Sequence, residues 1–140
     1  MENTVAPTAV LHLLERASDE HDLDALVECF VADYVNETPA HPAQGFRGRE
    51  QVRENWRQIL AGVPDLRARV LRSTADGETV WSEWEMSGTR RDGAAHLMRG
   101  VIIFVIAGGR IVSARFYLEP VDTSGTDVNA AVRSAVGGAP

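Results

Sequence analysis

The fold is decided by residues 66–119, which read LRARVLRSTADGETVWSEWEMSGTRRDGAAHLMRGVIIFVIAGGRIVSARFYLE. Turn-forming pairs interrupt this stretch at near-regular intervals, at Asp76-Gly77, Asp92-Gly93 and Gly108-Gly109. Between the turns, apolar and polar residues alternate with the two-residue period of a strand that buries one face. The pattern predicts four antiparallel strands, over 66–75, 78–90, 95–107 and 110–119. Such lengths exceed the usual strand of about five to six residues and favour a strongly curved, bulged sheet.

Upstream of Pro64 the apolar residues instead follow the period of a helix. Three apolar stripes predict three helices: Val10, Leu13, Leu14 and Ala17; then Leu23, Leu26, Val27 and Phe30; then Val52, Trp56, Ile59 and Leu60. We expect the first helix to be entered through Pro7-Thr8, the second to be capped by Asp22, and the third to run from about Gly48 to Gly62.

Residues 34–38, between the second and third helices, predict a brief strand that is closed by Pro39 and Pro42. Three helices with single apolar faces can cover the concave side of a curved sheet. Incomplete packing at the open end then leaves a cavity.

Composition excludes several classes of partner. The 140 residues are 44% hydrophobic and suit one domain, which we place at residues 1–121, followed by a flexible tail at 122–140. A net charge of −6 with scattered basic residues argues against nucleic acid. No apolar run approaches the roughly 20 residues that span a bilayer, and the N-terminus lacks a leader pattern, so we expect no membrane partner and a cytoplasmic protein. Cys29 is predicted to be a buried thiol, and the four histidines show no metal-ligand spacing, so neither a metal nor a cofactor is expected.

The order of the predicted elements is similar to the cone-shaped fold of the nuclear transport factor 2-like superfamily. Residues 34–39 followed by Gly48-Arg49-Glu50 resemble the SnoaL-like branch, in which a short strand ends at a proline and Gly-Arg-Glu opens the third helix. Residues 109–112, with Arg115, Tyr117 and Glu119, resemble the last strand of that branch. The resemblance covers about residues 8–121. It implies an α+β fold in which three N-terminal helices pack on a strongly curved antiparallel sheet.

Members of this superfamily include polyketide cyclases, ketosteroid isomerases, limonene-type epoxide hydrolases and non-catalytic binding proteins, so the fold alone does not fix the function. The resemblance therefore implies a small apolar ligand. It leaves the reaction open.

Tyr34 and Asn36 are the first candidates for chemistry. They lie two residues apart on one strand, so both side chains face the same way, and together they can orient a water or polarise an oxygen. The resemblance supports this reading, because a Tyr-x-Asn pair positions the attacking water in the limonene-type epoxide hydrolases. The alternative is a buried pair that only caps the strand end.

The rest of the known machinery is missing from this sequence. The charged positions of the epoxide hydrolases fall on Met86, Trp84 and Phe116, so hydrolysis by that route is not expected. The catalytic positions of ketosteroid isomerase fall on Thr38, Ile102 and about Leu14, which excludes that mechanism in its known form.

The SnoaL-like cyclases use an acidic residue near the end of the last strand, and the resemblance makes Glu119 a candidate general acid or base. A pocket mouth would desolvate such a group and raise its pKa. A solvated glutamate at the strand end is the alternative. His41 and His96 could act as bases at the pocket rim, because histidine titrates near neutrality.

Residues 81–86 alternate so that Trp84 and Met86 point to one face and Trp81, Glu83 and Glu85 to the other. We expect the first two to line the cavity and the glutamates to form an outer ladder with Arg99 and Arg115. Strict two-residue turns would place Arg99 opposite Met86, so this assignment requires a bulge or a longer turn. A slip by one residue would exchange the faces and make the two glutamates catalytic candidates.

These observations predict a protein that binds a small hydrophobic molecule. The main hypothesis is a cofactor-independent isomerase, cyclase or hydratase/hydrolase for an oxygen-bearing apolar substrate, and the alternative is a carrier or sensor. A homodimer through the outer sheet face is expected, with Trp81 and Tyr117 as its anchors. The expected catalytic residues are Tyr34, Asn36 and Glu119. The expected substrate-binding residues are Thr38, His41, Trp56, Trp84, Met86, His96, Met98, Ile102, Phe116 and Leu118.

Overall fold

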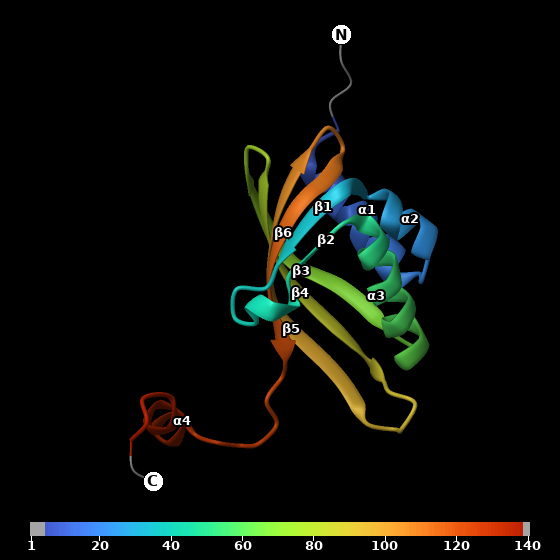
Figure 1. Cartoon of the computed structure of the whole chain (residues 1–140). Helices are drawn as coiled ribbons and strands as arrows, with labels where there is room; N and C mark the ends of the chain where they lie inside the picture. The colour runs from blue at the N-terminus through green and yellow to red at the C-terminus, as the bar shows by residue number, and fades with distance from the viewer. Residues whose placement is uncertain (1–4, 139–140) are drawn as a thin grey trace.

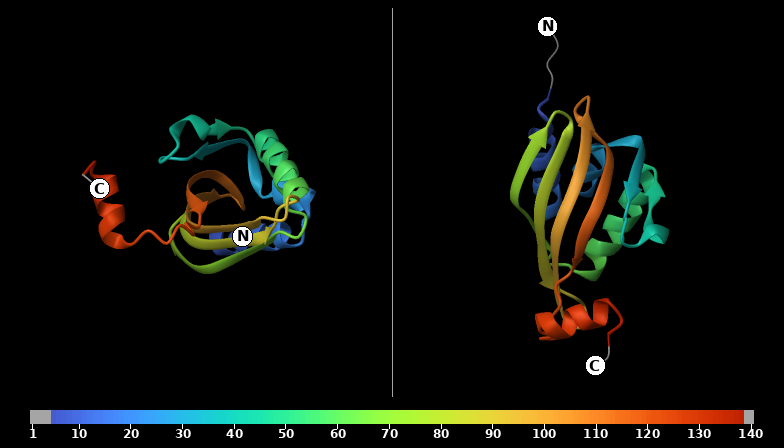
Figure 2. Two further views of the ribbon diagram at one scale, coloured as in Figure 1. Left: turned by 90° about the horizontal axis from the view of Figure 1, so that it is seen from below. Right: turned by 90° about the vertical axis from the view of Figure 1, so that its left-hand side faces the viewer.

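Three helices lie on the concave side of one six-stranded sheet in the computed structural model, which describes residues 5–138 (Figure 1). The sheet has the strand order β2-β1-β6-β5-β4-β3 and curls around the helices, as the view from below in Figure 2 shows. The helices are α1 (Pro7–Asp19), α2 (Leu23–Glu28), α3 (Arg49–Gly62) and α4 (Val128–Ala135). The strands are β1 (Phe30–Glu37), β2 (Phe46–Arg47), β3 (Arg67–Asp76), β4 (Thr79–Thr89), β5 (Ala95–Ala107) and β6 (Arg110–Pro120), with a short 3-10 helix, η1 (Pro42–Gln44).

The predicted α+β fold is confirmed, and the bounds of β3 to β6 differ from the predicted ones by at most one residue. Asp22 caps α2 as expected, because its Oδ1 accepts a hydrogen bond from the Ala25 N–H at 3.1 Å. The start of β1 was predicted wrongly. Phe30 belongs to this strand and not to the second helix, since the Cys29 carbonyl accepts a hydrogen bond from the Ile111 N–H at 2.7 Å. β1 thereby joins the sheet parallel to β6, while β2 was not predicted at all.

The connection between β4 and β5 settles which face each side chain takes. It spans residues 90–94, longer than a two-residue turn, and places Arg99 opposite Glu85. The two side chains form an ion pair with Nε and Oε2 2.9 Å apart, on the outer face of the sheet. Arg115 shares that face but lies opposite Ile103. Glu83 pairs with Arg72 instead, at 2.8 Å between Nε and Oε1.

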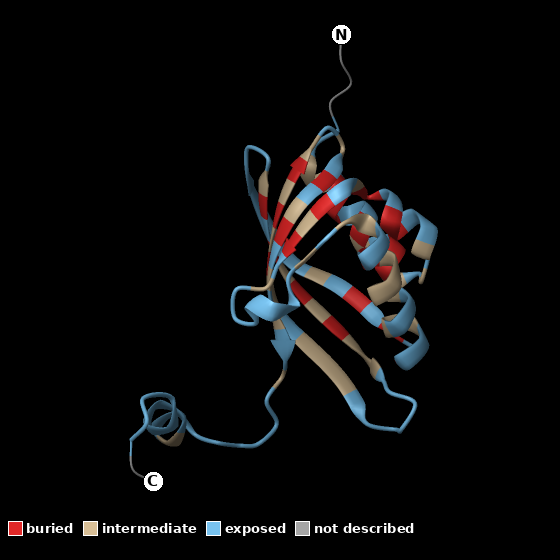
Figure 3. Cartoon of the chain, in the orientation of Figure 1, coloured by how far each residue is buried: buried red, intermediate tan, exposed pale blue. Residues whose placement is uncertain are grey.

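The core lies where α1 and α2 meet the sheet, and Figure 3 shows most buried residues gathered there. Cys29 is buried, as predicted, and its desolvation raises the pKa of the thiol to about 11. None of the helices in the described part of the chain is long and apolar enough to cross a membrane.

Past the end of β6, the predicted tail contains α4, and Val128 and Val132 on this helix and Val136 at its C-cap are exposed. The flexibility of residues 122–140 stays a prediction. Residues 1–4 and 139–140, at the two ends of the predicted domain and tail, lie outside the described range.

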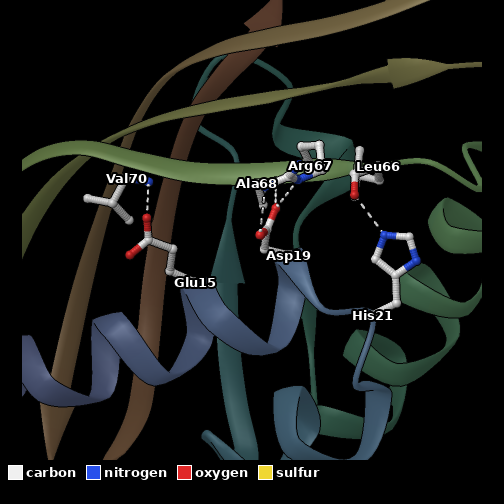
Figure 4. Close-up of polar contacts among 7 residues, drawn as sticks. All are labelled: Glu15, Asp19, His21, Leu66, Arg67, Ala68 and Val70. Atoms are coloured by element: carbon white, nitrogen blue, oxygen red, sulfur yellow. Dashed lines mark hydrogen bonds and ion pairs between the residues drawn. The ribbon is translucent and has the colours of Figure 1, made fainter.

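Carboxylates of α1 bind the backbone of β3, which is an edge strand and has unpaired groups on its outer side (Figure 4). The Val70 N–H donates to Glu15 Oε2 at 2.7 Å, and the Ala68 N–H donates to Asp19 Oδ1 at 3.0 Å. Four residues of helix and two residues of strand both advance by about 6–7 Å, so the two acceptors match the two donors. The helix is thereby fixed along the first half of β3.

Two further bonds extend this contact. Arg67 Nε donates to Asp19 Oδ1 at 2.8 Å, and this hydrogen bond lowers the pKa of the Asp19 carboxyl below its ordinary value. His21 Nε2 lies 2.7 Å from the Leu66 carbonyl oxygen, so Nε2 carries the proton in this bond. His21 has a φ of 61°, which turns the chain sharply from α1 toward α2.

Gly100 lies on β5 opposite Leu118 of β6, where the two backbones leave no room for a side chain. Its φ is 155°, and a Cβ at this position would lie 2.0 Å from the carbonyl oxygen of Tyr117 and 2.8 Å from the Cα of Leu118. Both contacts involve backbone atoms, which cannot move aside as a flexible side chain can. A side chain at residue 100 would therefore push the two strands apart.

We expect Gly100→Ala to lower the free energy of unfolding by about 3 kcal/mol, because the overlap adds to an unfavourable φ. Gly77→Ala is the matched control, since Gly77 has a φ of 60° in the β3–β4 turn and open space around it. It should lose only about 1 kcal/mol. Urea denaturation measures both, and equal losses would show that the close approach of the strands is unimportant.

Candidate functional site

Tyr34 and Asn36 form a buried polar pair on β1. Only 1% of Tyr34 and 7% of Asn36 is exposed, and the Tyr34 hydroxyl donates a hydrogen bond to Asn36 Oδ1 at 2.6 Å. The Tyr34 ring packs edge-on against Phe30 and Phe46, with ring centroids 4.7 and 6.0 Å apart. Aromatic contacts on two sides therefore hold the phenol in place, and the phenol holds the amide.

This geometry decides what each group can offer. Burial raises the pKa of the Tyr34 phenol far above its ordinary value, so the phenol stays neutral and serves as a donor. Among the described residues, every fully buried side-chain nitrogen and oxygen has a hydrogen-bond partner. The Asn36 Nδ2 makes no such bond within that part of the chain, so it is not fully buried, and Asn36 lines the adjacent cavity. The pair thus presents an amide N–H donor.

A cavity of about 400 Å³ lies between α3 and the sheet. Apolar side chains make up most of its wall, and each polar group on the wall is a neutral amide, hydroxyl or indole. The lining residues are Phe30, Tyr34, Asn36, Thr38, Gln44, Phe46, Val52, Asn55, Trp56, Ile59, Met86, Phe116 and Leu118. Both the volume and the character of the wall are typical of sites for small molecules.

Seven of the residues that the sequence proposed meet at this cavity: Tyr34, Asn36, Thr38, Trp56, Met86, Phe116 and Leu118. They come from β1, α3, β4 and β6, and from the residue that directly follows β1. Trp56, which the sequence places on the apolar stripe of the third helix, is half-buried and lies on the wall.

Four other proposed residues lie elsewhere. Trp84 and Ile102 are fully buried in the core. The Trp84 indole N–H donates to Ser82 Oγ at 2.9 Å, and this hydroxyl donates to the Ile102 carbonyl at 2.7 Å. Met98 packs against the core, and His96 borders a separate shallow depression beside Arg90. These side chains shape the surroundings of the cavity and do not line it.

Glu119 and His41 bind each other at the surface. Oε1 of Glu119 lies 2.7 Å from Nε2 of His41, and each side chain is 47% exposed. Strand alternation explains the position of Glu119, because its neighbour Leu118 points into the cavity. The pair ties the loop between β1 and β2 to the end of β6. Their exposure matches the alternative of a solvated glutamate and not that of a desolvated acid.

Sequence reasoning missed six lining residues: Phe30, Gln44, Phe46, Val52, Asn55 and Ile59. Asn55 could have been found, because it falls between Val52 and Trp56 on the apolar stripe of α3, where a polar residue is out of place. Gln44 and Phe46 lie in or just after an irregular loop, where periodicity carries no signal.

A larger groove of about 700 Å³ is lined by residues of α1, α2 and the turn between β5 and β6. Its wall includes Arg16, Glu20, Glu28 and Arg110, and an ion pair at 3.0 Å joins the last two. A wall that carries several charged side chains offers little to an uncharged apolar ligand. We therefore take the smaller cavity as the candidate site.

The family model of the SnoaL-like domain matches residues 10–114, which include the polar pair and most of the cavity wall. The chain belongs to this family. The match extends from α1 to β6, so the SnoaL-like domain comprises the three helices and the curved sheet. No curated protein sequence matches the chain.

Solved structures share the nuclear transport factor 2-like fold of this SnoaL-like domain. A loop-truncation variant of IdmH is 25% identical, with a TM-score of 0.68, over 81% of this chain and 92% of that one. RV0760c from Mycobacterium tuberculosis, solved in complex with estradiol-17β-hemisuccinate, is 18% identical, with a TM-score of 0.69, over 81% and 94%. An NTF2-like protein from Burkholderia pseudomallei is 15% identical, with a TM-score of 0.67, over 78% and 87%.

Tyr34→Phe should lower the free energy of unfolding by about 1–2 kcal/mol, because it leaves the buried oxygen of Asn36 without its donor. Tyr117→Phe removes the same hydroxyl from a side chain that is 40% exposed, and it should change stability by less than about 0.5 kcal/mol. Chemical denaturation of both variants tests this. An unchanged stability for Tyr34→Phe would mean that the hydroxyl does not hold the amide.

Proposed function

We propose that the protein binds a small, uncharged, largely apolar molecule with an acceptor oxygen and acts on it without a cofactor. The observation that carries this proposal is the Asn36 amide N–H, which opens onto an apolar cavity while the Tyr34 hydroxyl occupies its oxygen. A carbonyl or ether oxygen can accept a hydrogen bond from this amide. The rest of the molecule would lie against Phe116, Trp56 and their apolar neighbours.

The lining argues for a neutral ligand. Its polar groups are uncharged, and a charge moved from water into such a cavity without a partner would carry a large desolvation penalty. A volume of about 400 Å³ suits a molecule of drug or steroid size. The complex of RV0760c with an estradiol derivative supports this size class, because that protein shares the fold.

The cavity wall can support a reaction in two ways: it can hold a substrate in one orientation, and it can polarise a substrate oxygen. A fixed N–H donor stabilises negative charge that develops on a substrate oxygen, and single donors of this kind contribute about 3–4 kcal/mol in known enzymes. Cyclisation or isomerisation of a folded substrate fits such a site, because both gain from a fixed orientation. The raised pKa of Tyr34 makes the phenol a poor proton acceptor near neutrality. For Glu119 to transfer a proton, the loop that carries His41 would have to open.

A non-catalytic carrier or sensor is the second candidate, and the uncharged lining favours it. Ligand binding would then stabilise the protein without forming a product. Recovery of the bound molecule after long incubation separates the two functions, because an enzyme returns a changed molecule. We propose the cytoplasm as the site of action, consistent with a single buried cysteine.

A saturated steroid monoketone, 5α-androstan-3-one, is a suitable first probe of this SnoaL-like cavity. We expect it to quench the fluorescence of Trp56 and to raise the melting temperature. Asn36→Leu keeps the size of the side chain but removes the donor, so it should weaken binding by about 1 kcal/mol, or roughly fivefold.

Asn129→Leu is the control for this experiment, because it makes the same change on the exposed face of α4. It should bind the ketone as the unmodified protein does. Failure of the unmodified protein to bind, or equal affinity in the two variants, would remove the proposed role of Asn36.

We further propose that two copies pair through the outer face of the sheet. Trp81 is 50% exposed and Tyr117 40%, and the cross-strand register places Val101 and Ile103 between them on that face. Ion pairs flank this apolar patch on β3, β4 and β5. An apolar centre with a charged rim is typical of protein interfaces.

Sedimentation velocity should give the mass of two chains for the unmodified protein and of one chain for Trp81→Glu. Val128→Glu is the control, because it places the same charge on the exposed valine stripe of α4. A monomer in the unmodified protein, or a dimer in Trp81→Glu, would contradict pairing through this face.

A further inference from the structure

A second amide in the cavity repeats the arrangement at Asn36. Asn55 lies on α3, so it belongs to the helical wall, whereas Asn36 belongs to the sheet. Gln51, one helical turn earlier, donates a hydrogen bond from Nε2 to Asn55 Oδ1 at 2.8 Å. The oxygen of Asn55 is therefore occupied, as the Tyr34 hydroxyl occupies the oxygen of Asn36, but the bond to Asn55 lies at the surface and the bond to Asn36 is buried.

The two amides offer the same function to a ligand. In each, a neighbouring donor fixes the carbonyl oxygen, and the –NH₂ group remains for the cavity. The Trp56 indole adds to this bias because it can only donate. The Thr38 hydroxyl does not, because it donates its proton to the His41 carbonyl at 2.8 Å and so leaves its oxygen as an acceptor. Gln44 can donate or accept. The cavity thus presents more hydrogen-bond donors than acceptors.

We propose that the cavity selects neutral molecules with two acceptor oxygens, one bound by Asn36 on the strand wall and the other by Asn55 on the helix wall. A diketone is the simplest such ligand, and an amine would find few acceptors. This inference rests on the proposed function and deepens it, because it names the class of substrate. Asn55 is then a residue that determines specificity, and Gln51 is a positioning residue that acts through it.

Steroids with one and two ketones on the same skeleton test the inference. The probes are 5α-androstan-3-one and its 3,6-, 3,11- and 3,17-diones, which place the second oxygen at three different separations from the first. We expect at least one dione to bind about three- to tenfold more tightly than the monoketone, the gain of one neutral hydrogen bond. Tryptophan fluorescence titration gives the dissociation constants.

Asn55→Leu should abolish the advantage of that dione while the protein still binds the monoketone. Gln51→Leu should reduce the advantage, because it frees the Asn55 amide to rotate. Gln58→Leu makes the same amide-to-leucine change on α3, at an exposed residue outside the cavity lining, and should leave the advantage unchanged. The ratio of two affinities within one variant is insensitive to a general loss of stability.

Each outcome has a distinct meaning. If no dione exceeds the monoketone in the unmodified protein, or if Asn55→Leu keeps the advantage, the two-oxygen inference is wrong and the proposed single-oxygen site still stands. If neither monoketone nor dione binds, the proposed function itself fails. A selective loss of the dione advantage in Asn55→Leu, against an unchanged Gln58→Leu, supports the inference.

Discussion

The edge of β3 is the constraint on which the rest of the structure depends. An edge strand exposes unpaired backbone groups, and here the carboxylates of Glu15 and Asp19 bind two of them from one side of α1. Because the spacing of the helix matches that of the strand, α1 must lie along the first half of β3. It then fills the narrow part of the concave face, together with α2. The space between α3 and the sheet stays open, and this space is the cavity.

The amide groups of the cavity are also held by hydrogen bonds, here from residues close by in the sequence. Each amide that faces the ligand has its oxygen bound by a neighbour two or four residues away, Tyr34 for Asn36 and Gln51 for Asn55. Short sequence separations on a strand and on a helix turn are enough to orient them. The two amides are therefore oriented without the help of a charged residue. In the proposed complex, apolar contact would supply affinity, and the two amides would set the position of the ligand oxygens.

Much of this arrangement could be predicted from the sequence, and the exceptions have physical causes. Alternation grouped Phe116 with Leu118, and Trp84 with Met86, on one face of their strands, but the turn pairs alone left open which face was the inner one. Three-dimensional neighbours could not be predicted: the bond between His41 and Glu119 joins residues 78 positions apart through an irregular loop. The length of the β4–β5 connection was equally hidden, since Asp92-Gly93 marks a turn without giving its size. Phe30 continued an apolar stripe, but pairing with Ile111 drew it into a strand.

Gly100 influences the shape of the cavity wall without contributing a side chain to it. Its cross-strand neighbours are Trp84 on one side and Leu118 on the other, so this close approach of β5 and β6 lies beside a residue of the cavity wall. The contour there is drawn by backbone atoms and by a residue that contributes no side chain. Substitutions of the lining side chains can then change which molecule the cavity accommodates while the backbone of the sheet keeps its shape. In an evolving lineage, such a division lets new ligands be sampled without rebuilding the scaffold.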